Sequence, residues 1–320
     1  LEKNNGLLVA TAKGIFRYQK GVFKKILALN LNHQRNFVTD SNGDNWIGCD
    51  YGVLKITEQR IFCLNPDGLF EIAPNGKVIK STSSSKSNNN IIQNIQQVRF
   101  PVYNITLNKL QKMWIIVDSS DRNVAFLDLA KLPGNAHEWK FIKSPLAYSS
   151  DISGICEHNG SLWVTSGNPN IMLARYLIKE DKWLNVNLKE YGGDNVQTSI
   201  VETSDGTMWI GGHSKLYSLT ARGWRVYQYP EVSLPLSYLE IYVTPDENMI
   251  IYGANGTLRK LDLSSQTFGT LEGLNFNCNT PDGKFWFTTH SGEIVAGDAA
   301  LKYFRKYTVS DGLMNMAMSL

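Results

Sequence analysis

Short apolar segments, each centred on a large aromatic or aliphatic residue, recur along the whole chain. Their spacings are 38, 68, 49, 46, 41 and 36 residues, so the period is regular except at one long interval. Self-similarity at a period of about 20–50 residues indicates a repeat fold, and the long interval indicates an insertion. The seven central residues are Leu8, Trp46, Trp114, Trp163, Trp209, Ile250 and Trp286.

Each apolar segment has similar neighbours. A turn precedes four of the tryptophans, and its dipeptide tolerates positive φ at both centres of a type I′ hairpin, which predicts an antiparallel strand before it. These turns are Asn42-Gly43, Asn159-Gly160, Asp205-Gly206 and Asp282-Gly283. A third strand follows the apolar segment, and an aromatic residue then marks a fourth. These aromatic residues are Phe23, Phe62, Trp139, Trp183, Trp224, Phe268 and Phe304.

Seven copies of a four-stranded unit predict an all-β fold, a seven-bladed β-propeller of four-stranded antiparallel blades. The central tryptophans are expected to pack between adjacent blades. The chain opens on a second strand at 6–11, so we expect a C-terminal strand at 315–320 to join the N-terminal blade and close the ring. Residues 1–320 are therefore interpreted as one propeller.

The long interval is an insertion in blade two at about 65–98. Within it, residues 69–72 and 77–80 flank a turn and predict an extra hairpin, whereas 80–90 is a polar tract that cannot build a core. Two interpretations stay open for this insertion: a protruding hairpin or loop, and a contact with a partner.

Composition narrows the function classes. Among 320 residues, 42% are apolar and 19% are charged, which is typical of a globular protein. The net charge of +3 favours neither nucleic acid nor a membrane surface as a partner of this fragment. Four cysteines lie far apart, so we expect free core thiols, with no metal site and no cofactor. These cysteines are Cys49, Cys63, Cys156 and Cys278.

The repeats resemble a known family. Segments 205–212, 42–48 and 303–313 are similar to the two-component regulator propeller repeat, in which a D-G-x-x-W-I-G-T strand pair precedes a Gly-Leu strand and an aromatic strand. The likeness covers the whole chain at the level of the repeat. The copies with Leu8, with Leu110-Gln111 in place of Asp-Gly, and with Ile250 depart from it.

The resemblance implies a function. Such propellers usually form the extracytoplasmic, periplasmic sensor region of hybrid two-component histidine kinases in Bacteroides-type bacteria, where they regulate polysaccharide and oligosaccharide utilisation. The partners implied are an oligosaccharide, neighbouring domains of the same sensor, and a second copy in a homodimer of the full-length protein. This fragment is then not an enzyme, whereas the longer protein would be a histidine kinase.

Candidate chemistry is sparse. His213 and His290 occupy equivalent loops and would suit a streptogramin-lyase-like enzyme, the less favoured alternative. No carboxylate pair is nominated for glycoside hydrolysis, so no catalytic residue is predicted. A second alternative is a surface or secretion-associated propeller that serves as a protein-binding platform.

If the propeller binds a ligand, the loops between second and third strands and between fourth and first strands are expected to form the site. Aromatic and planar polar side chains on these loops suit a sugar. The predicted ligand-binding residues are Asp50, Tyr51, Asp121, Arg122, Asn168, His213, Tyr238 and His290. The sequence does not identify the sugar, the oligomeric state or the role of the insertion.

Overall fold

The strands of the chain form antiparallel sheets within two compact units, Leu1–Ser150 and Asp151–Leu320. The computed structural model describes residues 7–11, 13–19, 22–29, 31, 37–83, 92–108, 110–131, 139–146, 152–167, 171–191, 197–212, 215–228, 240–243, 249–254, 257–262, 267–272, 274–279, 284–289, 293–298, 301 and 304–307. Among the described residues, no helix is both long and apolar enough to cross a membrane.

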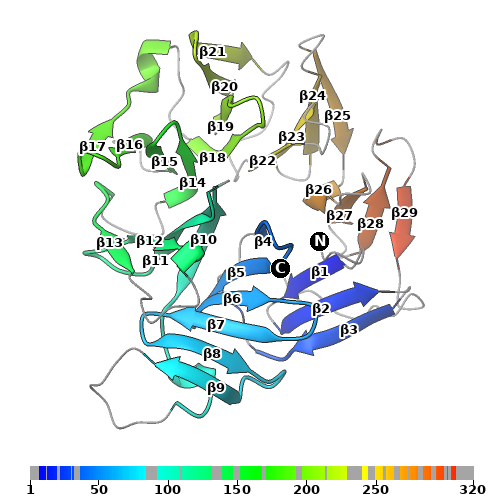
Figure 1. Ribbon diagram of the computed structural model, residues 1–320. Helices are drawn as coiled ribbons and strands as arrows, with labels where there is room; N and C mark the ends of the chain where they lie inside the picture. The colour runs from blue at the N-terminus through cyan, green and yellow to red at the C-terminus, as the bar shows by residue number, and fades with distance from the viewer. Residues whose placement is uncertain are drawn as a thin grey trace. The chain divides into compact units, whose positions relative to one another are not determined.

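The described part of the first unit contains three sheets (Figure 1). One has the order β1(Leu7–Thr11), β2(Gly14–Gln19), β3(Val22–Leu27). The next has β4(Phe37–Thr39), β5(Asn45–Cys49), β6(Gly52–Ile56), β7(Ile61–Asn65), β8(Gly68–Ile72), β9(Val78–Ser83). The last has β10(Val102–Leu107), β11(Lys112–Val117), β12(Val124–Asp128), β13(Lys140–Ile142). Among the described residues of this unit, the 3₁₀ helices η1(Ile95–Gln97) and η2(Leu129–Lys131) connect strands.

In the second unit, the described strands form four sheets of four strands each. Two of them are β14(Ile152–His158), β15(Ser161–Ser166), β16(Leu173–Leu177), β17(Lys182–Asn185) and β18(Gln197–Glu202), β19(Met208–Gly212), β20(Lys215–Thr220), β21(Gly223–Gln228), with η4(Leu188–Tyr191) between them in sequence. The others are β22(Glu240–Val243), β23(Met249–Ala254), β24(Thr257–Asp262), β25(Thr267–Glu272) and β26(Leu274–Asn279), β27(Phe285–Thr289), β28(Ile294–Gly297), β29(Phe304–Tyr307).

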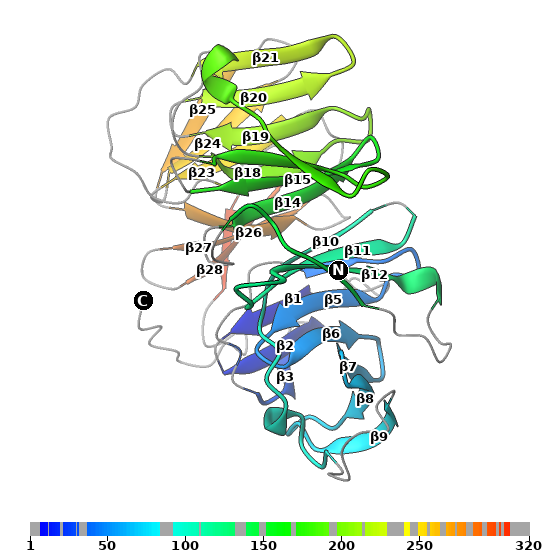
Figure 2. The same cartoon turned by 90° about the vertical axis from the view of Figure 1, so that its left-hand side faces the viewer.

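The all-β class is confirmed, but the strand count per sheet corrects the prediction. Six described sheets have four or more strands, whereas seven blades of four were predicted. The sheet β1–β3 has three described strands, and the segment 315–320 predicted to complete it lies outside the described residues. The sheet β4–β9 has six, because the predicted hairpin is present as β8 and β9 and extends the sheet at one edge (Figure 2).

The predicted turn type is correct only once among the described turns. Asn159 and Gly160 both have positive φ (48° and 67°), as type I′ requires. At Asn42-Gly43 and Asp205-Gly206 only the glycine has positive φ, because these connections are longer and need a single left-handed residue.

The departure at Leu110-Gln111 does not disturb the strand register. Gln111 adopts φ 59°, the conformation that glycine supplies in the related turns. The Asn108 carboxamide oxygen accepts hydrogen bonds from the backbone N–H groups of Leu110 and Lys112, both at 2.9 Å. A side-chain cap thus stabilises this turn without the usual dipeptide.

Tryptophan side chains pack between neighbouring sheets, as predicted. Trp46 is buried with residues of β10 and β11, Trp163 with residues of β18 and β19, and Trp209 with residues of β22 and β24. Trp114 and Trp286 are also buried, at 2% and 6% exposure. Their rings contact aromatic neighbours in the same sheets.

The sheets β4–β9 and β10–β13 approach each other closely at Gly48, near the candidate site. A Cβ at Gly48 in β5 would lie 2.6 Å from Val102 Cγ1 and 2.9 Å from the Val102 carbonyl oxygen in β10. Because Gly48 has no side chain, β10 packs directly against β5. The loop that follows β5 is thereby placed near the segment that precedes β10.

Candidate functional site

Four of the eight predicted ligand-binding residues lie in the described part of unit 1. Asp50 and Tyr51 connect β5 to β6, and Asp121 and Arg122 lie between β11 and β12. Both loops join a second to a third strand, or its equivalent, as predicted. The other four, Asn168, His213, Tyr238 and His290, lie outside the described residues, so their assignment stays a prediction.

The loop that carries Tyr51 is held by buried side chains beneath it. The Tyr51 carbonyl oxygen accepts a hydrogen bond from Asn65 Nδ2 at 3.2 Å and from Cys63 Sγ at 3.5 Å. Asn65 is fully buried, and its carboxamide oxygen accepts a hydrogen bond from the backbone N–H of Asp67 at 2.9 Å. One side chain therefore couples the Tyr51 loop to the turn that begins the insertion.

Backbone hydrogen bonds bring three distant segments together at this loop. The Phe100 N–H donates to the Asp50 carbonyl oxygen at 3.0 Å, and the Asp118 N–H donates to the Pro101 carbonyl oxygen at 3.0 Å. Residues 50–51, the segment 92–103 that returns from the insertion, and the start of the β11–β12 loop therefore share one surface region. Their relative positions are fixed by main-chain contacts rather than by flexible side chains.

Two tyrosine hydroxyls in this region lie near carboxylates. Burial raises the pKa of Tyr51 above its usual range, Asp50 and Cys49 add to the rise, and a hydrogen bond with Gln96 opposes it. Burial also raises the pKa of Tyr103, and the Asp118 carboxylate adds to the rise through its charge and a hydrogen bond. Both hydroxyls are therefore protonated at neutral pH.

Asp50 connects the two tyrosines electrostatically, because its charge raises the pKa of each. Arg99 is near enough to Tyr103 to act in the opposite direction. We call this group the Tyr51–Tyr103 cluster; its members are Asp50, Tyr51, Gln96, Arg99, Tyr103 and Asp118. The tyrosines and Asp50 are half-buried, whereas Gln96, Arg99 and Asp118 are exposed.

The helix η1 positions Gln96. A capping box fixes its start, with the Asn94 and Gln97 side chains bonded to backbone N–H groups. Ile95 is fully buried in the core shared with β1–β9, and its N–H donates to the Gly76 carbonyl oxygen at 2.9 Å. The insertion therefore returns through a fixed path, and Gln96 and Arg99 lie on it.

Asp121 and Arg122 make other contacts. Asp121 forms an ion pair with Lys143 at 3.8 Å, and the two side chains are 83% and 67% exposed. The Arg122 N–H donates to the Ser119 hydroxyl at 3.3 Å. An exposed pair of this kind contributes little to stability.

The sequence prediction missed four members of the cluster: Gln96, Arg99, Tyr103 and Asp118. Gln96 lies in the insertion and Arg99 lies just after it. The length of the insertion does not indicate where the chain returns to the next sheet. Tyr103 lies in β10 between Val102 and Asn104, where the register with β11 shifts. The one available signal was that the insertion must come back to the first strand of the next sheet at Val102.

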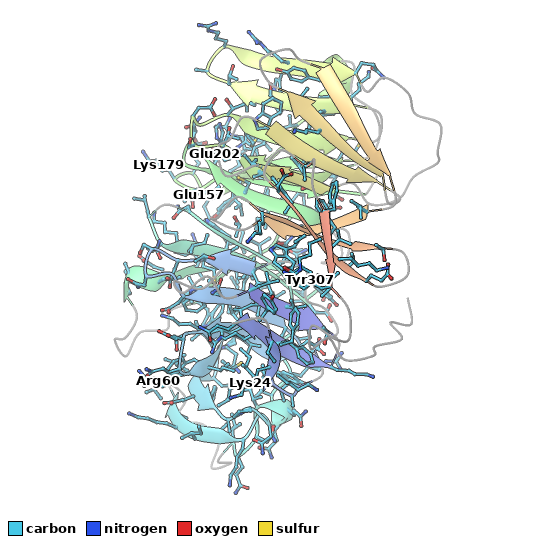
Figure 3. The ribbon with its side chains drawn as sticks, turned by 90° about the vertical axis from the view of Figure 1, so that its right-hand side faces the viewer. Lys24, Arg60, Glu157, Lys179, Glu202 and Tyr307 are labelled. Carbon is cyan, nitrogen blue, oxygen red and sulfur yellow. The ribbon has the colours of Figure 1, made fainter. Side chains whose placement is uncertain are left out.

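A second polar group lies in unit 2. His158 is 4% exposed; its Nδ1 lies 3.0 Å from Glu202 Oε2 and its Nε2 lies 2.9 Å from Asn159 Nδ2. This contact links the ends of β14 and β18, and Figure 3 shows Glu202 near Glu157 at the same end of the unit. With both ring nitrogens bonded, His158 is interpreted as a structural tie between sheets.

The described cysteines are core residues. Cys49, Cys63 and Cys156 are free and buried, as predicted, whereas the Cys278 side chain is outside the description. Burial, with the Glu202 and Glu157 charges, raises the pKa of Cys156 to about 12, so its thiol is not a nucleophile at neutral pH. Within the described residues, no group of three or more His, Cys, Asp or Glu side chains could hold a metal ion.

One stretch of the chain matches a known protein family. Residues 190–214 match the family described as "Two component regulator propeller". This stretch contains β18, the Asp205-Gly206 turn and β19, so the resemblance seen in the sequence is confirmed there. No curated protein sequence matches the chain.

Solved structures show the fold. The extracellular domain of BT4673 from B. thetaiotaomicron, described as a hybrid two component system, gives a TM-score of 0.59 at 15% identity over 93% of this chain and 36% of that one. The extracellular domain of BT3049 from the same organism, described likewise, gives 0.58 at 20% identity over 93% and 37%. U3-55K gives 0.54 at 8% identity over 88% and 83%.

At these identities the likeness shows the fold alone, an all-β propeller. The chain spans 36–37% of the length of the two B. thetaiotaomicron extracellular domains. Activities and partners of a whole sensor are therefore matters for proposal.

Proposed function

We propose that this chain is an extracytoplasmic ligand-binding propeller of a hybrid two-component sensor kinase that controls the use of oligosaccharides. The observation that carries the proposal is the structural likeness over 93% of the chain to extracellular domains described as parts of hybrid two component systems. The family match over 190–214 supports it independently, because it rests on sequence. The kinase itself would reside elsewhere in the longer protein, and this propeller would be periplasmic.

The propeller is proposed to have seven blades closed into a ring. Six sheets have at least four described strands, and β1–β3 has three, one fewer than a complete blade. A strand from 315–320 beside β1 would complete this blade and cover its open edge. Removing residues 315–320 should then lower the melting temperature by several degrees, whereas an unchanged melting temperature would argue against closure.

Signalling follows from differential binding. A ligand, or apposition of a neighbouring domain, changes the output only if it binds one arrangement of the sensor dimer more tightly than the other. The propeller's role in this scheme is to present a binding surface to an oligosaccharide or to another domain of the sensor.

The direct test is a glycan-binding screen of this chain beside the complete ectodomain. We expect one oligosaccharide, or one related set, to bind the ectodomain and to drive phosphorylation of the full-length kinase in membranes. If the ectodomain binds no glycan, the oligosaccharide assignment is wrong. If the reading frame beyond Leu320 encodes no membrane segment and no kinase, the sensor assignment is wrong and the protein-binding platform replaces it.

A further inference from the structure

We infer that the Tyr51–Tyr103 cluster is a subsite for a neutral, hydroxyl-rich oligosaccharide. The inference rests on the proposed function and goes beyond it by naming the residues and the chemical class of the ligand. The insertion in the sheet β4–β9 is then part of the binding site rather than only a hairpin that extends the edge of the blade.

Preorganisation is the first argument. The cluster joins three segments far apart in sequence, and each is locked by contacts that do not involve the exposed polar groups. Main-chain bonds connect Phe100 to Asp50 and Asp118 to Pro101, while Asn65 holds the Tyr51 carbonyl from below. A ligand that bound here would not need to order the backbone, so little affinity would be lost to that cost.

The second argument is the mixture of functional groups. Carboxylates of Asp50 and Asp118 accept hydrogen bonds from hydroxyls, and the Gln96 amide and Arg99 guanidinium donate to ring and hydroxyl oxygens. Tyr51 and Tyr103 are half-buried and add aromatic surface next to these polar groups. Sugars present this combination of hydroxyls and apolar ring faces.

Charge selects among sugars. The cluster has two carboxylates and one guanidinium, so its formal charge is negative. Uronic acids and sulfated sugars would bring further negative charge toward Asp50 and Asp118 and would be repelled. A neutral oligosaccharide meets no such penalty.

An apolar peptide is a poorer match. The large apolar side chains that are exposed in the described part of the chain are elsewhere: Val22, Ile79, Leu110, Val226 and Phe304. Peptide grooves depend on buried apolar anchors, and the cluster instead gathers groups that hydrogen-bond.

The insertion and the residue that follows it provide two recognition groups. Gln96 is carried on η1, and Arg99 follows it before the chain enters β10. Ile95 and Val98 anchor this stretch in the core shared with β1–β9. Because side chains at Gln96 and Arg99 alternate with these buried anchors, changes at the two exposed positions should alter specificity without disturbing the fold.

The test uses neutral manno-, gluco-, xylo- and galacto-oligosaccharides, with oligogalacturonate and chondroitin sulfate oligosaccharides as acidic probes. Affinities are measured by calorimetry with this chain and with the complete ectodomain. We expect binding of a neutral probe at least ~10-fold tighter than of any acidic probe, since close like charges cost about this much or more.

The variants are Tyr103→Phe, Asp118→Asn and Arg99→Gln, with Glu180→Gln, at an exposed carboxylate of unit 2, as the control. We expect each cluster variant to weaken neutral-sugar binding ~5–30-fold, as for loss of a hydrogen bond to ligand, and the control to stay within about twofold. Circular dichroism and melting temperature confirm that each variant is folded.

The outcomes separate the inference from the proposed function. Neutral-sugar binding that all three folded variants retain, or a preference for acidic probes, overturns the subsite while the sensor assignment stands. Absence of any glycan binding by the complete ectodomain overturns both. Selective loss in the cluster variants with an unaffected control supports the subsite.

Discussion

The two ends of the sheet β4–β9 both carry acidic side chains, and the two ends use them differently. At the β4–β5 turn, Asp40 is 7% exposed and accepts hydrogen bonds from the N–H groups of Asn42 and Asp44 and from Trp46 Nε1, at 2.9–3.0 Å. Lys55 also lies 3.9 Å from it. At the β5–β6 loop, Asp50 is half-buried beside two tyrosine hydroxyls.

The difference teaches how to separate structural from functional polar residues in a repeat protein. Asp40 uses its acceptor capacity on the local backbone and on the tryptophan that anchors the sheet, so it stabilises the turn. The Tyr51–Tyr103 cluster is assembled from three segments and reaches solvent through Gln96, Arg99 and Asp118. Its main-chain scaffold is satisfied within the fold, and the side chains of Gln96, Arg99 and Asp118 stay exposed beside the two tyrosines.

Asp40→Ala should destabilise the β4–β5 turn, and we expect it to have the largest effect on the free energy of unfolding. It removes the acceptor of the buried Trp46 N–H and two turn hydrogen bonds, so we expect a loss of about 2–3 kcal/mol in the free energy of unfolding. Urea denaturation measures it. Asp121→Ala is the control, with an expected change within about 0.5 kcal/mol. Equal stability of the two variants would show that the turn does not depend on this carboxylate.

Asn65→Ala should weaken the support of the β5–β6 loop, which carries Tyr51. Because Asn65 is fully buried and bonds to both the Tyr51 carbonyl and the Asp67 N–H, we expect a loss of about 1–3 kcal/mol. The affinity for a neutral oligosaccharide should fall as well. Asn75→Ala, at an exposed turn of the same sheet where Asn75 caps the Lys77 N–H at 3.2 Å, is the matched control. A variant at Asn65 that matched this control in stability would contradict the coupling.

Asp205→Ala tests a related turn in unit 2 through its pH dependence. Hydrogen bonds from the Thr203 hydroxyl and the Thr207 N–H hold the pKa of Asp205 below its usual range. A lowered folded-state pKa contributes stability above the unfolded pKa of about 3.9, and this is lost as the pH falls through the folded value. The stability difference between wild type and variant should therefore be largest near pH 7 and shrink below about pH 4. A stability difference that grew as the pH fell would contradict a lowered pKa of Asp205 in the folded state.

Tyr51→Phe and Tyr103→Phe test whether the two hydroxyls stabilise the fold, and we expect them to have the smallest effect on the free energy of unfolding. Each substitution removes one hydroxyl at a half-buried position and keeps the ring, so we expect changes within about 0.5 kcal/mol in unfolding free energy. A loss of 2 kcal/mol or more, on the order of that expected for Asp40→Ala, would mean that these hydroxyls are structural.

Much of the strand pattern was predictable because its signals are local. Alternation, central tryptophans and turn dipeptides each depend on a few neighbouring residues, and they correctly located strands β5, β15, β19 and β27 and the hairpin β8–β9. Turn geometry was less predictable. The loop at Leu110-Gln111 has no turn dipeptide, and the Asn108 cap replaces it.

The candidate site was predictable only in part. Asp50 and Tyr51 follow a recognisable strand, so their loop could be identified from the sequence. Gln96, Arg99, Tyr103 and Asp118 join them through contacts between segments separated by 45 residues or more, since Tyr51 to Gln96 is 96 − 51. Such contacts depend on where the chain returns after the insertion, which no local pattern specifies.

By itself, the sequence determined the repeat, the all-β class, the strand order within each sheet and the tryptophans that pack between sheets, because short-range periodicity and turn chemistry encode them. Only the tertiary structure decided which polar residues are saturated by the fold, as at Asp40, and which gather at one surface, as in the Tyr51–Tyr103 cluster. The physical reason is that hydrogen-bond saturation depends on partners brought close by packing, and packing is a property of the whole folded unit.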